Sequence, residues 1–527
     1  MHSIKVLDVT LRDGGCVNDF NFGSKYMDQI LLAEERAGIN CIELGYIDDK
    51  NGAESGRTKF ISINAANKFI KQKRKDIEYL VMMDYGKYDV STLPPKSDSG
   101  VDGIRVAFHK KDLMGIASIG KTIIEKGYNL YIQPMLTCHY SDEELLQLIK
   151  IVNEEISQLK ALYIVDSFGE MRANDVIRIF NIYDHNLLSK INLGFHSHNN
   201  LQLSYSNAIS FILFQTKRNI YIDSSILGMG KGAGNLNTEL LLDHLNIYYG
   251  KKYELLPLMN IIDSTLNPLK AEYNWGYSIK YYLSSKYHIS PSYANYFYDK
   301  HSLSITQLSE LLDMVDERKK ISFDKEYAQN IYLEYKAKNL IDDSSAVEKL
   351  KRIIEGRNIL LIAPGKNAKI YIANIKKCIQ EEDPVIIGVN DSDLVNIDYL
   401  FITRMKLLEQ FVDSKIKIIT LSNITTDVNN VFAILNYSRW VIADGETHDS
   451  AGVVSLKLME FCHPNKVMLA GFDGLSYNLN ENYYDETMRY AYSEESVINS
   501  NKFYKNFIKN LREKIEIDFI TPSVYEE

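Results

Sequence analysis

The sequence has few cysteines, no excess of positive charge and no long apolar run, and each absence excludes a class of protein. Its 527 residues include five cysteines, none of them in a CxxC pair, so we expect reduced thiols rather than a disulfide framework or a zinc knuckle. The formal net charge of −9 argues against a general nucleic-acid-binding protein, which needs a basic face. No apolar stretch approaches the ~20 residues of a membrane span, and the N-terminal residues lack the apolar segment of a signal peptide. We therefore expect a cytoplasmic protein that binds neither nucleic acid nor membrane.

The first 250 residues alternate short β-branched runs with longer amphipathic segments. The runs begin roughly every 25 to 38 residues, the spacing that a strand, a helix and two loops require. They predict strands at Lys5–Thr10, Cys41–Tyr46, Tyr79–Met83, Gly103–Phe108, Leu130–Met135, Ala161–Val165, Asn192–Phe195 and Tyr221–Ile226. Apolar periodicity predicts helices such as Tyr26–Ala37, Glu143–Gln158 and Val176–Leu187. Eight such units, with polar motifs at the ends of several strands, favour a (β/α)8 TIM barrel over residues 1–250.

The remainder of the chain divides into two further parts. Residues 251–355 have a mostly helical pattern and are rich in tyrosine, which predicts a helical extension packed on the barrel. From residue 356 to 527 a second alternating region predicts a Rossmann-like α/β domain. Its predicted strands are NILLIAPG, PVIIGVND, DYLFIT, KIKIITL, RWVIADG and KVMLAGFDG.

Three short motifs lie at predicted strand ends of the barrel. DVTLRDGG (residues 8–15) places an arginine beside a carboxylate, a pair that could stabilise an oxyanion and bind a hard cation. HSHNN (residues 196–200) places two imidazoles on one face of a strand, within reach of one ion. A glycine-rich loop (residues 228–234) lets backbone approach a ligand, and Asn235 after it offers an amide oxygen.

Each motif alone also fits a structural role: a surface ion pair, buried histidines or a flexible loop. Together they bring a carboxylate, two imidazoles and an amide oxygen from three adjacent strands to one barrel mouth. This mixed nitrogen and oxygen set suits an octahedral ion with open positions, so Mn2+ or Mg2+ is expected rather than structural zinc.

The motifs DVTLRDGG, GFHSHNN and DSSILGMGKGAGNLNTE, in this order, resemble those of the HMGL-like metal-dependent barrel family, which includes 4-hydroxy-2-oxovalerate aldolase, 3-hydroxy-3-methylglutaryl-CoA lyase and isopropylmalate synthase. The resemblance covers residues 4–245. It implies one divalent cation and the following roles: Asp13, His196 and His198 as metal ligands, Asn235 near the metal, Arg12 as the group that polarises the enolate oxygen, Glu43 in support of the metal shell, and Asp166 with Ser167 on the carboxylate of a 2-oxo acid.

The glycine-rich loop is closest to that of the aldolases, because it lacks the catalytic cysteine of the lyase branch. In those aldolases a histidine proton acceptor follows the metal-binding aspartate by three residues, and here that position is Cys16. A thiol near a cation and Arg12 could have a lowered pKa and move the proton instead. His109, His139 and Tyr85 are alternative bases, and a small buried spacer is the alternative role for Cys16.

The C-terminal region resembles nucleotide-sugar-handling Rossmann-like domains in ILLIAPGKN, VIIGVND, DSAGVVSLKLMEF and VMLAGFDGLSYN. We therefore expect a metal-dependent aldolase or lyase acting on a small 2-oxo acid and an aldehyde through a pyruvate-type enolate. The resemblance also implies a role in surface-polysaccharide biosynthesis, a nucleotide-sugar site and a homo-oligomer. Two alternatives remain open: an acyl-CoA-dependent Claisen acyltransferase on the same barrel, and a bifunctional protein or nucleotide-sugar-binding scaffold.

Overall fold

The chain forms two compact units, Met1–Pro291 and Ser292–Glu527, in a computed structural model. The structure describes residues 3–300, 303–338, 340–391, 393–411, 414–424, 429–444, 446–478, 480–485, 492 and 494–526. Within these residues no helix is both long and apolar enough to cross a bilayer. The three-part division at residues 250 and 355 stays a prediction.

The first unit is a closed parallel barrel. Its strands are β1 (Ile4–Asp8), β2 (Cys41–Ile47), β3 (Lys59–Phe60), β4 (Glu78–Asp84), β5 (Gly103–Phe108), β6 (Asn129–Pro134), β7 (Ala161–Asp166), β8 (Asn192–Ser197) and β9 (Ile220–Ser224). The sheet order is β1-β9-β8-β7-β6-β5-β4-β2-β3, and β1 also pairs with β2, which closes the ring. The predicted eight-stranded barrel is therefore confirmed, and the two-residue β3 is an addition beside β2.

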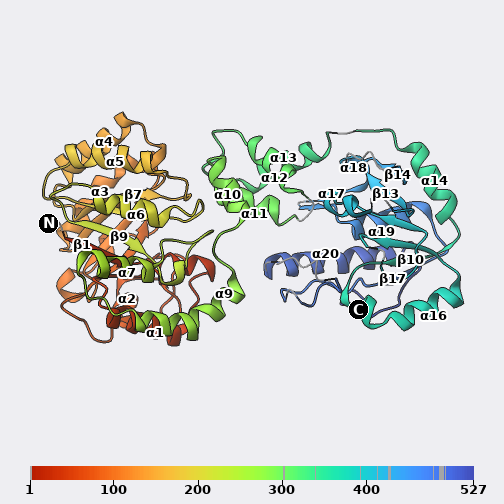
Figure 1. The fold of residues 1–527 in the computed structure, drawn as a ribbon, viewed down its shortest axis with the longest axis horizontal. Coiled ribbons are helices and arrows are strands. Elements are labelled where there is room, and N and C mark those ends of the chain that lie inside the picture. Colours follow the sequence, from red (N-terminus) through yellow and green to blue (C-terminus); the bar gives the residue numbers. More distant parts are fainter. Residues whose placement is uncertain are drawn as a thin grey trace. The chain divides into compact units, whose positions relative to one another are not determined.

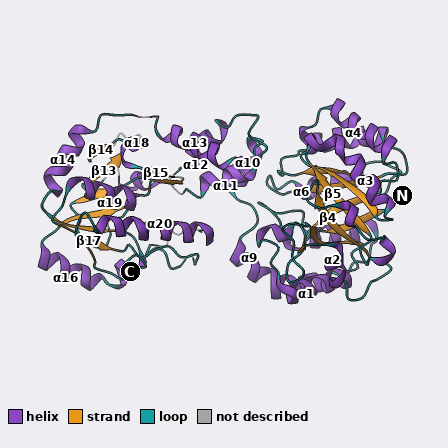
Figure 2. Ribbon diagram, turned by 180° about the vertical axis from the view of Figure 1, so that it is seen from behind, coloured by secondary structure: helices purple, strands orange, loops and turns teal. Residues whose placement is uncertain are grey.

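Helices surround this ring of strands (Figures 1 and 2). They are α1 (Gly23–Ala37), α2 (Ile63–Phe69), α3 (Ile116–Glu125), α4 (Asp142–Glu155), α5 (Ala173–Asn186), α6 (Ser204–Leu213) and α7 (Thr238–Tyr249). Local sequence explains where they begin: Ser141 and Glu144 form a reciprocal capping box at the start of α4. Apolar faces of the helices pack on the outside of the strands, while a separate buried cluster that includes Leu7, Tyr131 and Tyr163 fills the barrel interior.

Residues 256–354 are mostly helical, as predicted. The helices are α8 (Leu256–Ile261), α9 (Asn267–Tyr273), α10 (Ile279–Lys286), α11 (Pro291–Tyr298), α12 (Ile305–Asp313), α13 (Lys325–Lys336) and α14 (Ser344–Ile354). The first of them, α8, packs against α1 of the barrel.

The second unit contains a seven-stranded parallel sheet in the order β14-β13-β12-β11-β10-β17-β18. The strands are β10 (Asn358–Ile362), β11 (Val385–Val389), β12 (Tyr399–Phe401), β13 (Lys417–Leu421), β14 (Val431–Leu435), β17 (Lys466–Ala470) and β18 (Ile517–Phe519). Its helices are α15 (Lys366–Ile370), α16 (Ile372–Glu382), α17 (Met405–Leu408), α18 (Tyr437–Trp440), α19 (Ala451–Cys462) and α20 (Glu494–Arg512). The chain adds strands outward from β10 to β14 and then returns to place β17 on the other side of β10. The order in which strands are added therefore reverses between β10 and β17, although all seven strands are parallel.

One predicted strand of this sheet is wrong. The segment RWVIADG begins in helix α18 and continues as β15 (Ile442–Asp444), which pairs antiparallel with β16 (Glu446–His448) outside the main sheet; its last residue, Gly445, lies outside the described residues. The edge position belongs to β14, which the sequence did not predict. Its five residues, VFAIL, are all apolar, but only two of them are buried.

Candidate functional site

A carboxylate and two imidazoles meet at the carboxyl end of the barrel strands. Asp13 follows β1, His196 lies on β8, and His198 comes directly after β8. One ligand atom from each of the three lies within 4.8 Å of the others, and all three residues are buried. The Nε2 atom of His198 lies 3.9 Å from an Asp13 carboxylate oxygen, a separation that leaves room for one ion bound to both.

The His196 ring is held by a buried ionic network. Its Nδ1 lies 3.0 Å from the Oδ2 atom of Asp223, so the imidazole donates there and its Nε2 is left for a cation. The same Asp223 oxygen accepts from Arg105, whose other terminal nitrogen donates to Glu43 at 2.8 Å. Arg105 has no exposed surface. The network therefore fixes the orientation of a predicted ligand from three further strands, β2, β5 and β9.

Arg12 lies beside the triad with one donor free. Its Nε donates to Glu43 at 2.6 Å and its Nη1 to Asp13 at 3.0 Å. Its Nη2 is buried and has no hydrogen-bond partner among the described residues. Glu43 thus holds Arg12 rather than reaching the triad directly, and the guanidinium keeps a donor that an oxyanion would accept from.

Asn235 lies against Asp13, but through its amide nitrogen. Nδ2 donates to Asp13 at 2.5 Å and to the Met229 carbonyl at 3.1 Å. Its Oδ1 is buried and has no partner among the residues described. A Cβ added at Gly230 would lie 2.3 Å from that Nδ2 and 2.9 Å from Asp13 Oδ2. This glycine of the predicted loop is therefore required by the close packing around Asp13.

Cys16 lies next to the triad, with Sγ 4.0 Å from Asp13 Oδ1. The residue has exposed surface, yet desolvation of its thiol, and then the Asp13 carboxylate, raise the pKa of Cys16 to about 12. The pKa of Cys16 is therefore raised, whereas the sequence suggested a lowered one. A bound cation would act in the lowering direction.

The side chains of Asp166 and Ser167 accept hydrogen bonds from backbone groups of the loops around the mouth. The Asp166 carboxylate accepts from the backbone of Glu170 at 2.8 Å and of Met171 at 3.1 Å. The Ser167 hydroxyl accepts from the Leu136 backbone at 3.0 Å and retains its own proton for donation. Substrate binding by Ser167 stays a prediction.

The donor set fits a divalent cation. Burial by itself would raise the pKa of Asp13, but Arg12 and the two imidazoles hold that pKa well below its ordinary value. Burial lowers the pKa of His198 to about 4, so its imidazole is neutral at pH 7, as a metal ligand must be. Its Nδ1 and the Oδ1 of Asn235 are buried polar atoms with no partner in the described part of the chain. The set contains oxygen and imidazole ligands and no thiolate.

Sequence reasoning missed Arg105 and Asp223. Both lie on strands that were predicted, β5 and β9. A charged residue within GIRVAF, whose six residues are all buried, is itself a signal, because an arginine is rarely buried without a partner.

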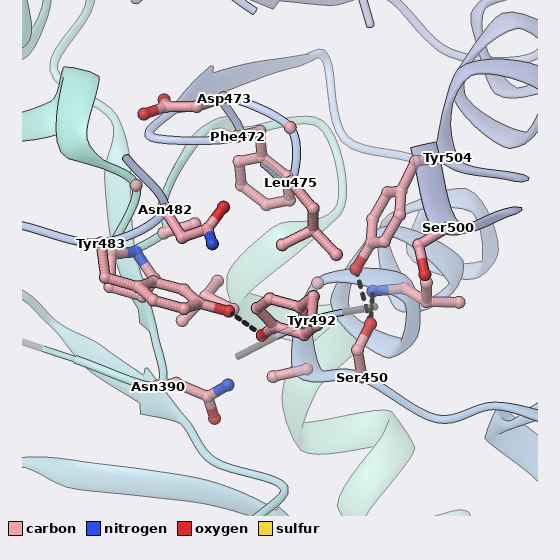
Figure 3. A pocket seen from close by; sticks show the side chains of 18 of the residues that line it. Asn390, Ser450, Phe472, Asp473, Leu475, Asn482, Tyr483, Tyr492, Ser500 and Tyr504 are labelled. Carbon is pink, nitrogen blue, oxygen red and sulfur yellow. Dashed lines mark hydrogen bonds between the residues drawn. The ribbon is translucent and has the colours of Figure 1, made fainter. Parts of the chain in front are cut away.

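The second unit contains a pocket at the carboxyl ends of β10 and β17 (Figure 3). This is where the strand order reverses, the position at which open α/β sheets bind ligands. Polar groups of several segments line it, including Ser450 at the start of α19, Asn482 and several tyrosines. Tyr483 and Tyr492 share a hydrogen bond of 2.6 Å, and Ser450 and Tyr504 share one of 2.5 Å.

The buried carboxyl of Asp473 in this pocket should make the stability of the protein depend on pH. Its Oδ2 accepts from the Asn367 backbone at 2.7 Å, and burial raises its pKa from 3.8 to about 6. The carboxyl therefore binds a proton more tightly in the folded state, and its contribution to stability is lost as pH rises from 3.8 to 6. Asp473→Asn should raise the thermal midpoint relative to the wild type near pH 7.5 and much less near pH 4.5. Scanning calorimetry at both pH values checks this, and an equal difference at both would contradict it.

Comparisons with known proteins agree with the barrel. The HMGL-like family model matches residues 3–251. The 4-hydroxy-2-oxovalerate aldolase of Geobacillus genomosp. 3 is 28% identical over 280 residues, which are 51% of this chain and 78% of that protein. The aldolase of the same name from Carboxydothermus hydrogenoformans is 28% identical over 273 residues, 50% of this chain and 77% of that protein. Among solved structures, the N-terminal domain of a "putative aldolase" from Bacteroides vulgatus has 27% identity and a TM-score of 0.50, covering 57% of this chain and 98% of that domain.

Proposed function

We propose that this chain, whose residues 3–251 match the HMGL-like family model, is a metal-dependent oxo-acid aldolase that forms or cleaves a carbon–carbon bond through a pyruvate-type enolate. The observation that carries the proposal is the convergence of Asp13, His196 and His198 beside Arg12, whose Nη2 is buried and unpaired among the described residues. The names of the relatives support the substrate class, a 2-oxo acid with an aldehyde.

Each residue has a role that its position supports. Asp13, His196 and His198 would hold one Mn2+ or Mg2+, with Asn235 beside them. The cation supplies Lewis acidity toward the oxygens of the 2-oxo acid. Arg12 donates from Nη2 to the enolate oxygen as negative charge develops there, and Glu43 keeps the guanidinium in place. Ser167 donates to the substrate carboxylate with the proton it retains.

Cys16 is proposed as the residue that moves the proton, on grounds of position. Its sulfur lies 4.0 Å from Asp13, whereas His139 of the alternative bases is engaged with Glu170.

A comparison of acceptors tests the reaction class. Purified protein with Mn2+ should consume pyruvate in the presence of a panel of short and sugar-derived aldehydes, and should not condense acetyl-CoA with any 2-oxo acid. Acetyl-CoA-dependent condensation without aldehyde turnover would replace the proposal with the acyltransferase.

A second candidate function concerns the other unit. The pocket at the β10–β17 switch point favours a bifunctional or nucleotide-sugar-binding protein with a role in surface-polysaccharide biosynthesis. Titration calorimetry of the full-length protein with CMP, UDP and UDP-sugars tests this, with inorganic phosphate as the control. Heat with phosphate alone, or with none of these compounds, contradicts nucleotide-sugar binding.

We propose that the protein is cytoplasmic, which its five free cysteines support. We also propose that it is a homo-oligomer, and sedimentation velocity measures the oligomeric state directly.

A further inference from the structure

A second group of metal-ligand side chains lies outside the Asp13 triad. Cys138 and His139 belong to a short 3-10 turn after β6 (Thr137–His139), and Glu170 lies in the loop after β7. One ligand atom from each of these three residues lies within 4.8 Å of the others. A fourth side chain, His288 in the turn after α10, places its Nδ1 2.8 Å from Glu170 Oε2. The proposed aldolase chemistry uses none of the four.

The side chains of the other three residues converge on the Glu170 carboxylate. Cys138 Sγ lies 3.1 Å from Oε1, and His139 Nε2 contacts the same oxygen. Glu170 is buried, with 3% of its side chain exposed, whereas His139 is 23% exposed and His288 67% exposed. The cluster is therefore closed on the protein side and open toward solvent through one imidazole, which gives an ion a path of entry.

The surrounding backbone holds the cluster in place. Thr137 accepts from the Val165 backbone at 2.8 Å, which fastens the 3-10 turn to β7. The backbone amide of Glu170 donates to Asp166 at 2.8 Å. His288 has a left-handed backbone with φ of 53°, which costs energy for a residue other than glycine and requires compensating contacts. The turn after β6 and the loop after β7 are thus fixed independently of any ion, whereas the turn that carries His288 is strained.

We propose that Cys138, His139, Glu170 and His288 form a second metal site, of the zinc type, that shares no residue with the Asp13 triad. A thiolate, two imidazoles and a carboxylate are the ligands of four-coordinate zinc, and the two negative charges balance the ion. The thiolate separates this site chemically from the triad, whose oxygen and imidazole ligands favour a harder ion. The chain would therefore bind two different metals.

The second site also has a mechanical consequence. The segment from Trp275 to His288 contacts three loops of the barrel mouth: Trp275 donates to the Leu227 carbonyl at 3.1 Å, Asn200 donates to Ser284 at 3.4 Å, and Ser285 donates to the Phe168 carbonyl at 2.7 Å. An ion bound by His288 and Glu170 fastens the C-terminal end of this segment to the loop after β7. The second metal is thus a clamp on a segment that lies against the loops after β7, β8 and β9.

Cobalt spectroscopy tests the site without any measurement of activity. Full-length apoprotein titrated with Co2+ should develop a near-ultraviolet thiolate-to-cobalt charge-transfer band, because the second site contains a thiolate and the triad does not. We expect Cys138→Ser to lose the band and Glu170→Gln to weaken cobalt binding strongly, with total metal falling from about two equivalents per chain to about one in both. Asp13→Asn should keep the band while losing the other equivalent, so this test and the proposed aldolase can fail separately.

Cys16→Ser is the matched control, because Cys16 is the thiol next to the triad. It should keep the band. A band that survives Cys138→Ser but disappears in Cys16→Ser would overturn the proposal, and so would a wild type with no band, in which Glu170 accepts hydrogen bonds only. As a second readout, Zn2+ should slow amide exchange over residues 279–290 about tenfold in the wild type and not in Cys138→Ser; equal exchange in both would remove the clamp.

Discussion

Arg12→Lys should lower kcat for aldol cleavage by about 10²–10³-fold while the protein keeps its metal. Lysine retains the positive charge, but it cannot reproduce the planar fork that donates to Glu43 at 2.6 Å and to Asp13 at 3.0 Å and leaves Nη2 for substrate. The loss should fall on kcat rather than on KM, because the free donor acts on charge that develops in the transition state. Steady-state kinetics with Mn2+ at saturation measures both constants.

Metal content and folding are the controls for this variant. Bound Mn2+ per chain and the circular dichroism spectrum should match those of the wild type. If Arg12→Lys binds its metal and its kcat lies within about threefold of the wild-type value, Arg12 does not stabilise the transition state.

Arg105→Leu should lower the free energy of unfolding of the barrel by about 3–5 kcal/mol, because Glu43 and Asp223 are left as buried charges without their shared cation. Arg105 is fully buried between these two carboxylates and lies 4.8 Å from the Tyr163 ring. The two tryptophans allow the barrel to be followed alone, since Trp275 lies in the first unit and Trp440 in the second. Urea unfolding in a Trp440→Phe background, monitored by Trp275 fluorescence, measures the change.

Lys68→Leu is the matched control within the same unit. Lys68 pairs with Glu54 at 2.9 Å, and the two side chains are 70% and 63% exposed. This exposed pair should contribute less than about 1 kcal/mol. If Arg105→Leu destabilises the barrel no more than Lys68→Leu does, the buried network is not a stabilising element.

The barrel could be predicted from sequence because its strands are buried runs at regular spacing. β5 begins and ends at the predicted residues, and the other seven predicted strands differ by one or two residues at their ends. The triad could be anticipated because Asp13 lies in the loop after β1, and His196 and His198 lie near and just after the end of β8, so the topology alone brings them to one mouth. In the second sheet β14 was missed although its sequence, VFAIL, is wholly apolar, because a short apolar run does not by itself distinguish a strand from a buried helical segment.

Contacts between distant segments could not be predicted. Arg105 reaches Glu43 across 62 residues of sequence and Asp223 across 118. His288 and Glu170 are likewise 118 residues apart. No local pattern encodes such pairs, because they depend on how strands and loops are placed after the barrel closes. The orientation of Asn235, with its nitrogen rather than its oxygen toward Asp13, is a property of packing for the same reason.

The most direct measurement compares pyruvate release from a 4-hydroxy-2-oxo acid by chelator-treated protein before and after Mn2+ is restored, in the wild type and in His196→Ala. We predict that chelation abolishes release, that Mn2+ restores it in the wild type, and that His196→Ala stays inactive at the same Mn2+ concentration. Release that persists in the chelated protein, or that Mn2+ restores equally in His196→Ala, would contradict a metal-dependent aldolase built on the Asp13 triad.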